Sequence, residues 1–301
     1  MSYVCIDGGQ TRTTVSVLDE DGACLGSWEE KPLTTPSKPG ALEGLRAVAR
    51  GVCEELERRG SLPRAMCFSL TGYLEGDEGI PVLVEEEVRG VLPAVERVHT
   101  VPDYVGNWAA ATRGEPGVVV ISGGGAVAYG RNAQGDSLRV GGWGHLLGDE
   151  GSGYWIGLEA IKAALGSWSG VSARTPLQRE IMEKFCSSTD LDLIQEIYSG
   201  QASDAGIANL APLVASHARA GDEVSDEILD RAARHLAKIA AAALQNLGEP
   251  PVYLSGGVFG AATMQERFER ALENLGHATA VTTVAADPQA GIFLIAREGL
   301  T

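Results

Sequence analysis

Residues 141–157 read GGWGHLLGDEGSGYWIG, a glycine-dense stretch that includes two acids, Asp149 and Glu150. Glycine lets a backbone approach a ligand closely and adopt the positive φ that tight turns need. The continuation SGYWIGLEAIKAAL turns apolar with helical spacing, so we expect a folded loop that enters a helix at about residue 154. Both a structural Ω-loop and a binding loop are compatible with this composition.

The strand pattern that precedes this loop occurs twice in the chain. Apolar runs at residues 3–6 and 117–121 each stop at a glycine loop, DGGQTRT at 7–13 and SGGGA at 122–126, and further strands and helices follow both. Two such units predict an α/β fold with two lobes around a central cleft, residues 1–113 and 114–301. The closing helix at 288–298 is expected either in the second lobe or packed back on the first. Between the helix expected from about residue 154 and the last strands, further helices are expected at 172–186, 191–199, 204–220 and 225–247.

The composition excludes several classes of function. Lys and Arg number 24 against 40 Asp and Glu, giving a net charge of −16, which argues against nucleic-acid and anionic-membrane surfaces because both need basic patches. The five cysteines are scattered without CxxC spacing, which is typical of reduced thiols in a cytoplasmic protein. The longest uncharged run, 116–130, contains three consecutive glycines and is too short to span a membrane.

Four loops follow strands and carry polar residues. The first two, 7–13 and 122–126, offer backbone amides and hydroxyls to a phosphate, and Asp7 could hold Mg²⁺ through water. Arg12 faces either the phosphates or solvent, and an ordinary hairpin is the alternative for the first loop. The third, LSGGVF at 254–259, is either a flat surface for a nucleoside or a tight β–α connection. In the fourth, Asp103 precedes a helix and is either an N-cap or a general base.

These loops, in this order over essentially the whole chain, resemble the phosphate and adenosine loops of the sugar-kinase/Hsp70/actin superfamily. The stretch GGWGHLLGDEGSGYWIG resembles the signature of N-acetylglucosamine kinases and of the wider BadF/BadG/BcrA/BcrD-type ATPases. The resemblance implies two ribonuclease-H-like (actin-like ATPase) lobes that close on ATP and a sugar. It further implies a kinase of an amino sugar or hexose, N-acetylglucosamine or glucosamine, acting at the 6-hydroxyl.

The resemblance also assigns roles to individual residues. Asp103 would accept the proton of the sugar hydroxyl, and Asp7 would hold the metal. Asp149 would accept hydrogen bonds from the sugar, while Glu150 would hold the loop. The ATP-binding residues would be Gly8, Gly9, Thr11, Arg12, Thr13, Gly123, Gly124, Gly125, Gly256 and Gly257. The substrate-binding residues would be Thr71, Asp103, Ala126, Gly142, Trp143, Gly144 and Asp149.

The sequence departs from the family pattern in three places. Relatives commonly carry GTGS where this chain has Gly123–Ala126 as GGGA, so two hydroxyls are absent. Gln10 replaces the third glycine of the first loop. Residues 33–36 read LTTP where N-acetylglucosamine kinases carry a sugar-binding Asn. The identity of the sugar therefore stays open.

Other interpretations are compatible with parts of the sequence. A non-catalytic sugar or nucleotide sensor would explain the altered phosphate loop, although Asp7, Asp103 and Asp149 are all present. An ATPase activator of a radical dehydratase needs clustered cysteines, which the scattered ones here disfavour. A lone His in a glycine loop favours a structural hydrogen bond over ligand binding for His145. Packing is likewise favoured over ligand stacking for Trp143 and Trp155. The resemblance also allows a homodimer.

Overall fold

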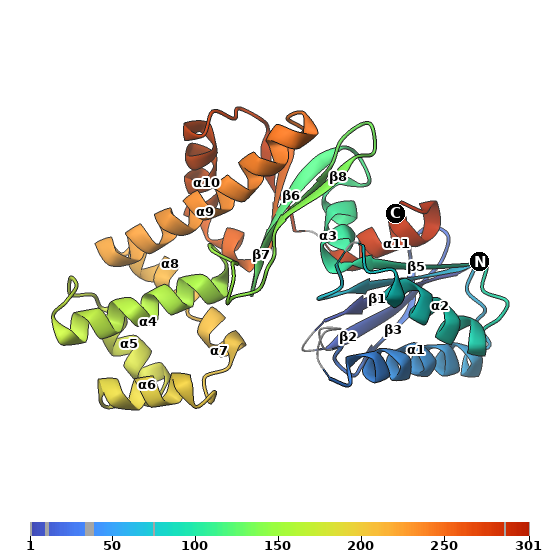
Figure 1. Cartoon of the computed structure of the whole chain (residues 1–301), viewed down its shortest axis with the longest axis horizontal. Helices are drawn as coiled ribbons and strands as arrows, with labels where there is room; N and C mark the ends of the chain where they lie inside the picture. Colours follow the sequence, from blue (N-terminus) through green and yellow to red (C-terminus); the bar gives the residue numbers. More distant parts are fainter. Residues whose placement is uncertain (1, 10–11, 34–38, 75, 286, 301) are drawn as a thin grey trace. The chain divides into compact units, whose positions relative to one another are not determined.

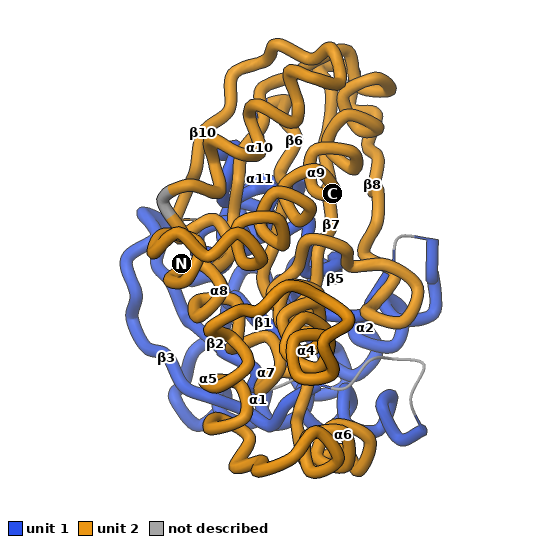
Figure 2. Tube along the Cα trace, turned by 90° about the vertical axis from the view of Figure 1, so that its left-hand side faces the viewer, with its two compact units in different colours: residues 1–115, 286–301 blue, residues 116–285 orange. Residues whose placement is uncertain are grey.

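The computed structural model describes residues 2–9, 12–33, 39–74, 76–285 and 287–300. The chain forms two compact units (Figure 2): unit 1 comprises Met1–Glu115 and Ala286–Thr301, and unit 2 comprises Pro116–Ala285. Each unit has a five-stranded sheet and a hydrophobic core (Figure 1). Unit 1 therefore takes its last helix from the far end of the chain.

The sheet of unit 1 has the strand order β3-β2-β1-β4-β5. Its strands are β1 (Tyr3–Gly8), β2 (Thr13–Leu18), β3 (Cys24–Glu30), β4 (Ala65–Leu70) and β5 (Arg97–Pro102). β1 pairs antiparallel with β2 and parallel with β4, which in turn pairs parallel with β5. The carboxyl ends of β1, β4 and β5 consequently lie at one edge, where Asp7 is in register with Ser69.

Two pairs of helices cover the sheet of unit 1. On one face lie α1 (Ala41–Arg58) and α2 (Gly79–Val91), which share a core with Val4 and Ile6 of β1. The apolar residues of α1 recur at helical spacing, so one side of the helix is buried against the sheet. On the other face lie α3 (Asp103–Thr112) and α11 (Pro288–Glu298), where Phe293 contacts Tyr3 edge-on at 5.4 Å. Alternate residues of β1 thus serve opposite faces.

The sheet of unit 2 repeats this topology with the order β10-β9-β6-β7-β8. Its strands are β6 (Gly117–Ser122), β7 (Ala126–Arg131), β8 (Ser137–Gly141), β9 (Val252–Ser255) and β10 (Val281–Thr283). β6 takes the place of β1, because it pairs antiparallel with β7 and parallel with β9. The loops after β6 and β9 therefore meet at one edge of this sheet as well.

The helices of unit 2 fill the long segment between β8 and β9 and follow β9. They are α4 (Gly153–Ser169), α5 (Leu177–Lys184), α6 (Asp190–Tyr198), α7 (Asp204–Ala208), α8 (Ala211–Arg219), α9 (Glu223–Leu247), the short 3₁₀ helix Gly257–Gly260 and α10 (Ala262–Asn274). The long helix α9 packs on β6, β7 and β8 and carries α10. Asp222 caps the N-terminus of α9 through the Ser225 N–H, and Gly248 ends the helix at a φ of 78°.

The structure confirms the predicted α/β fold class and corrects two helices. The helix expected at 172–186 is shorter, because α5 spans Leu177–Lys184 with Pro176 at its N-cap. The single helix expected at 204–220 is wrong, because the segment forms two helices, α7 and α8, separated at Asn209 and Leu210. Pro212 occupies the first turn of α8. Proline has no N–H to donate to the preceding turn and clashes with its carbonyl, so a continuous helix through this position is disfavoured.

Within the ranges that the structure describes, no helix combines the length and the apolar character needed to cross a membrane.

Candidate active site

In unit 1, the connection from β1 to β2 holds Asp7, Gly8 and Gly9. A Cβ on Gly8 would lie 2.6 Å from a side-chain carbon of Leu33 and 2.7 Å from one of Leu70, so a larger residue would displace these two buried side chains. The Gly9 N–H donates to the carbonyl of Arg12 at 3.0 Å and closes the turn. Thr11, predicted to bind ATP, lies outside the described residues, as do Gln10 and residues 34–36.

Arg12 and Thr13, which follow this turn, both bond to residues of β3 or of the segment just after it. The Arg12 guanidinium pairs with Glu29 at 3.3 Å, and both side chains are exposed. Thr13 is buried in β2, and its hydroxyl donates to the carbonyl of Lys31 at 2.8 Å. Of the two alternatives for Arg12, the structure thus has the guanidinium at the surface, next to the carboxylate of a neighbouring strand.

Asp103 is the first residue of α3, directly after β5. The N-cap of this helix is Pro102, so Asp103 does not occupy the capping position that one interpretation of the sequence gave it. The Thr71 hydroxyl donates to Asp103 Oδ2 at 2.9 Å. Burial raises the pKa of Asp103, and hydrogen bonds from Thr71 and from the backbone N–H groups of Tyr104 and Asp103 oppose the rise. The Thr71 hydroxyl therefore orients the half-buried Asp103 carboxylate through Oδ2, and burial makes this carboxylate more basic.

Asp7 lies in a strongly acidic environment. Burial raises the pKa of Asp7 to about 6, with further contributions from the charges of Asp103 and Asp287, and Arg12 opposes them. Asp287 caps α11 through a 3.0 Å bond from the Gln289 N–H. Sequence reasoning did not assign Asp287 to the site, although an Asp before a Pro at the start of a helix is a recognisable capping signal.

In unit 2, the loop SGGGA joins β6 to β7 and is bonded to the sugar loop of residues 141–153. The buried Ser122 hydroxyl donates to the carbonyl of Gly151 at 2.9 Å. The Gly153 N–H donates to the carbonyl of Gly123 at 2.7 Å, and the Gly123 N–H donates to that of Gly125 at 3.0 Å. Ala126, assigned to the substrate, is the buried first residue of β7.

The sugar loop is built from left-handed residues. Gly141, Gly142, Gly144 and Gly151 have φ between 69° and 90°. The Arg139 guanidinium donates to the carbonyls of Gly141 and Gly142 through Nη1, at 2.6 and 3.2 Å, and so fixes the bend by which β8 enters the loop.

Asp149 also has a positive φ, 61°, which Asp tolerates better than most residues. Its carboxylate accepts hydrogen bonds from the backbone N–H groups of Ala126 and Gly144, which oppose the rise in its pKa caused by burial. The acid predicted to contact the sugar therefore also joins two loops.

The aromatic residues of the sugar loop differ in exposure. Trp143 is 61% exposed, whereas Trp155 is half-buried. The centroid of the Trp155 ring lies 5.3 Å from that of the His235 ring and 5.1 Å from the guanidinium carbon of Arg231. His145 is exposed and its ring lies 4.7 Å from that of Tyr154. Trp155 thus packs against neighbouring side chains, whereas most of the Trp143 side chain is exposed.

The loop after β9 packs on the loop after β6. Gly256 has a φ of 103° and a ψ of 163°, a conformation essentially restricted to glycine. A Cβ there would lie 2.3 Å from the carbonyl oxygen of Ser122. Gly257 begins the 3₁₀ helix, and a Cβ on it would meet none of the described atoms within 4 Å. Unit 2 therefore brings the three loops predicted for phosphate, sugar and adenosine together at one sheet edge.

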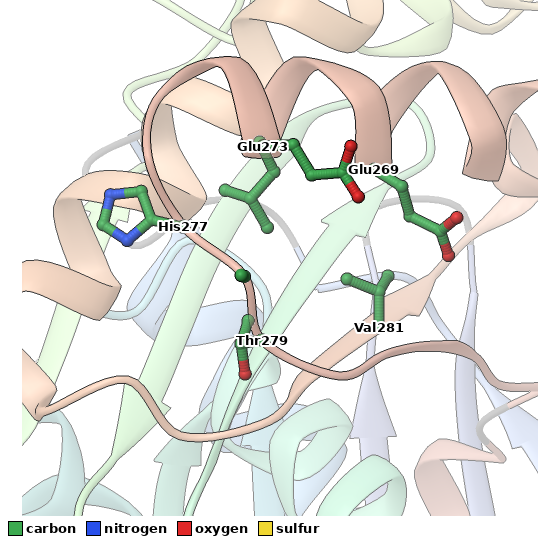
Figure 3. A pocket seen from close by; sticks show the side chains of 7 residues that line it. Glu269, Glu273, His277, Thr279 and Val281 are labelled. Atoms are coloured by element: carbon green, nitrogen blue, oxygen red, sulfur yellow. The ribbon is translucent and has the colours of Figure 1, made fainter.

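A surface pocket of about 240 Å³ lies elsewhere in unit 2 (Figure 3). Among the described residues, Glu269, Leu272, Glu273, His277, Ala278, Thr279 and Val281 line it. Glu269 and Glu273 come from α10, and His277 and Thr279 from the loop that follows. None of these residues belongs to the predicted site.

The chain is similar to known proteins over most of its length. The model of a family described as the BadF/BadG/BcrA/BcrD ATPase family matches residues 4–291. An N-acetylmuramic acid/N-acetylglucosamine kinase of Clostridium acetobutylicum is 35% identical over 240 residues, 78% of this chain and 77% of that protein. An N-acetyl-D-glucosamine kinase of Dictyostelium discoideum is 29% identical over 312 residues, 98% of this chain and 97% of that protein.

A solved structure shares the fold. The protein, from Chromobacterium violaceum, is provisionally assigned as an N-acetylglucosamine kinase. It superposes with a TM-score of 0.74 at 24% identity, covering 98% of both chains.

Proposed function

Because this chain belongs to the BadF/BadG/BcrA/BcrD ATPase family, we propose that it is an ATP-dependent sugar kinase that phosphorylates the 6-hydroxyl of an amino sugar, N-acetylglucosamine or glucosamine. Relatives named as kinases of N-acetylated amino sugars, 29% and 35% identical over most of the chain, support the sugar kinase. The two units are proposed to be the two lobes of the kinase.

The observation that carries the mechanism is the setting of Asp103. Its Oδ2 accepts a hydrogen bond from Thr71, so the carboxylate is oriented and the other oxygen can accept the proton of a sugar hydroxyl. A general base works best when its pKa approaches the operating pH, and burial moves the pKa of Asp103 in that direction. Asp103 would position the attacking oxygen, and phosphoryl transfer depends mainly on such positioning and on electrostatic stabilisation.

The glycine loops would provide the ATP side of the reaction. In unit 1, Gly8 and Gly9 with Arg12 and Thr13 would contact the phosphates. In unit 2, Gly123 to Gly125 would do so, although the Gly123 N–H already donates to the carbonyl of Gly125. Gly257 borders open space and Gly256 holds the loop against Ser122, which supports an adenosine surface there. Ala126 lacks the hydroxyl of the family pattern, so the backbone N–H groups would carry the phosphate contact.

The donor set around Asp7 fits Mg²⁺. Within the described residues, no three metal-binding side chains come together, so a cation would rest on one or two carboxylates and otherwise on water and phosphate oxygens. Asp7, crowded by Asp103 and Asp287, gains electrostatically from a cation. When bound, Mg²⁺ would offset the charge that develops on the transferred phosphoryl group.

In unit 2 the sugar would contact Ala126, Gly142, Trp143, Gly144 and Asp149, and Thr71 is the contact proposed from unit 1. The exposed Trp143 and the Asp149 carboxylate supply an apolar surface and a hydrogen-bond acceptor, the two kinds of contact that a sugar ring needs. A cytoplasmic location, a homodimer and the absence of nucleic-acid binding stay predictions of the sequence.

The test is an ADP-release assay coupled to a sugar panel. We expect turnover with N-acetylglucosamine or glucosamine, less with glucose, and none with the matching 6-deoxy amino sugar, which keeps the ring contacts but lacks the acceptor. N-acetylmuramic acid and an anhydro-muramic sugar complete the panel. If no sugar stimulated ADP release, the kinase would be the wrong assignment, and turnover of the 6-deoxy sugar would exclude the 6-hydroxyl.

A further inference from the structure

The three consecutive glycines of the SGGGA loop have different surroundings. A Cβ on Gly123 or on Gly124 would meet no described atom within 4 Å. A Cβ on Gly125 would lie 2.8 Å from Oδ2 of Asp149 and 3.3 Å from its Cγ. All three glycines have φ outside the left-handed region, so alanine is conformationally allowed at each of them. Space, and not backbone conformation, distinguishes Gly125.

The neighbour of Gly125 is an acid that joins two loops. The Asp149 carboxylate accepts the N–H of Ala126, at the end of the SGGGA loop, and the N–H of Gly144, in the sugar loop. A second link lies beside it, because the Gly142 N–H donates to the carbonyl of Ala126 at 3.0 Å. The position of the carboxylate therefore depends on both loops at once.

We infer that Gly125 is a positioning residue for the sugar, because its missing side chain leaves the space in which the Asp149 carboxylate is held. This inference rests on the proposed function, in which Asp149 accepts hydrogen bonds from sugar hydroxyls. It reassigns one glycine of a phosphate loop to the sugar side of the reaction. The phosphate contact is left to Gly123 and Gly124, which border open space.

A methyl group at residue 125 would displace the Asp149 side chain and no backbone atom. The atom it would meet is the end of a side chain, so the carboxylate can turn away while the backbone stays in place. That movement would break the hydrogen bonds from Ala126 and Gly144 and displace the sugar acceptor. The fold would survive, and the loss would fall on sugar binding.

The experiment compares Gly125→Ala with Gly123→Ala and Gly124→Ala in the full-length chain, with ATP and the preferred amino sugar. Losing a hydrogen bond to a charged acceptor corresponds to about a tenfold change, so Gly125→Ala is expected to raise the sugar KM about tenfold. Its ATP KM is expected to stay within about twofold, a change too small to report a lost contact. Gly123→Ala and Gly124→Ala should show the opposite pattern, a raised ATP KM and an unchanged sugar KM.

A double-mutant cycle shows whether Gly125 acts through Asp149. Glycine suits the positive φ of residue 149, so Asp149→Gly removes the carboxylate with little backbone strain. In that background Gly125→Ala should leave kcat/KM for the sugar unchanged within about twofold, since the methyl then has room. If Gly125→Ala alone fails to fold, the double variant should fold, for the same reason.

Three results would overturn the inference. They are a Gly125→Ala variant that raises only the ATP KM, an equal effect of Gly125→Ala with and without Asp149, and a double variant as unfolded as the single one. Each differs from a failure of the proposed function, in which the unmodified protein itself would turn over no sugar, and which would remove the inference as well.

Discussion

Unit 1 and unit 2 share one sheet topology, yet the carboxyl ends of their strands carry different chemistry. In unit 1 the strand ends hold the acids Asp7 and Asp103, both with raised pKa values and with Asp287 close to Asp7. In unit 2 the same edge holds glycine loops whose backbone groups bond to one another, with Asp149 between them. The comparison teaches that two copies of one sheet topology can present different groups at the same edge, carboxylates in one unit and backbone groups in the other. In the proposed mechanism, the first would accept the proton and the second would contact the phosphates.

The largest effect is expected from Asp103→Asn, which removes the proposed base from unit 1. Asn has the same size as Asp, and its carbonyl oxygen can still accept the hydrogen bond from Thr71. The fold and the KM for ATP should therefore stay unchanged. The loss of general-base catalysis should lower kcat by a factor of about 10²–10⁴. Asp136→Asn, in the exposed β7–β8 turn, is the matched control and should leave sugar-dependent ADP release unchanged. A fully active Asp103→Asn would place the base elsewhere.

Gly256→Ala should break the packing of unit 2. The added Cβ would meet the backbone of Ser122 at 2.3 Å, and residue 256 would be held in a conformation essentially restricted to glycine. We expect a loss of about 2 kcal/mol or more in the free energy of unfolding and a fall of roughly 4–8 °C in Tm. Gly257→Ala, which meets open space, should unfold at the unmodified temperature in the same calorimetric scan. Equal Tm values for both variants would contradict the backbone contact.

Asp7→Asn tests the acidic character of unit 1 through pH. The pKa of Asp7 is about 6 in the folded protein and about 4 when unfolded, so the folded state binds the proton more tightly. Stability from this group is therefore fully present below pH 4 and is lost as pH rises through 6, by on the order of 2 kcal/mol. Urea unfolding at several pH values should show this slope in the unmodified protein.

In the Asp7→Asn variant the slope between pH 4 and 6 should largely disappear, leaving it the more stable protein above pH 6. Mg²⁺ should restore stability at neutral pH only where Asp7 is present, because the cation offsets its charge. Parallel pH curves for the two proteins would show that Asp7 ionises normally.

The smallest effect is expected from Thr71→Val, which removes the donor to Asp103 and keeps the shape. The pKa of Asp103 should rise, moving the acid limb of the pH–kcat/KM profile to higher pH, and kcat/KM at neutral pH should fall about tenfold. Thr71→Ser keeps the hydroxyl and should restore the profile. A role in binding the sugar alone would instead raise KM in Thr71→Val and leave the acid limb in place.

Periodicity and glycine punctuation sufficed to predict the fold. Short apolar runs stopping at DGG and SGGG predicted two related sheets, and the helix expected at 225–247 corresponds to α9, Glu223–Leu247. The helix at 204–220 was wrong because the apolar spacing continues through Pro212 while the backbone cannot. The prediction followed the apolar spacing and overlooked the one residue, Pro212, that cannot donate a helical hydrogen bond.

The contacts inside the site could be predicted only where they are local. That Arg12 would meet Glu29 can be inferred from hairpin register, since Glu29 of β3 pairs with Thr14, two residues after Arg12. The Asp149 contacts with Ala126 and Gly144, and the crowding of Asp7 by Asp287, join segments far apart in the chain or depend on left-handed turns. A single sequence does not reveal which residues from separate segments come close together in space. The roles assigned to the site residues stay predictions.

The place of α11 has a consequence for how the protein is made. Unit 2 is one continuous stretch, whereas unit 1 needs α11, which packs against α3 and β1. During synthesis, residues 3–115 leave the ribosome before unit 2, but α11 leaves it only after unit 2. Unit 1 therefore stays incomplete until the whole of unit 2 has been translated, and removing α11 would damage a unit that lies mostly before it in the chain.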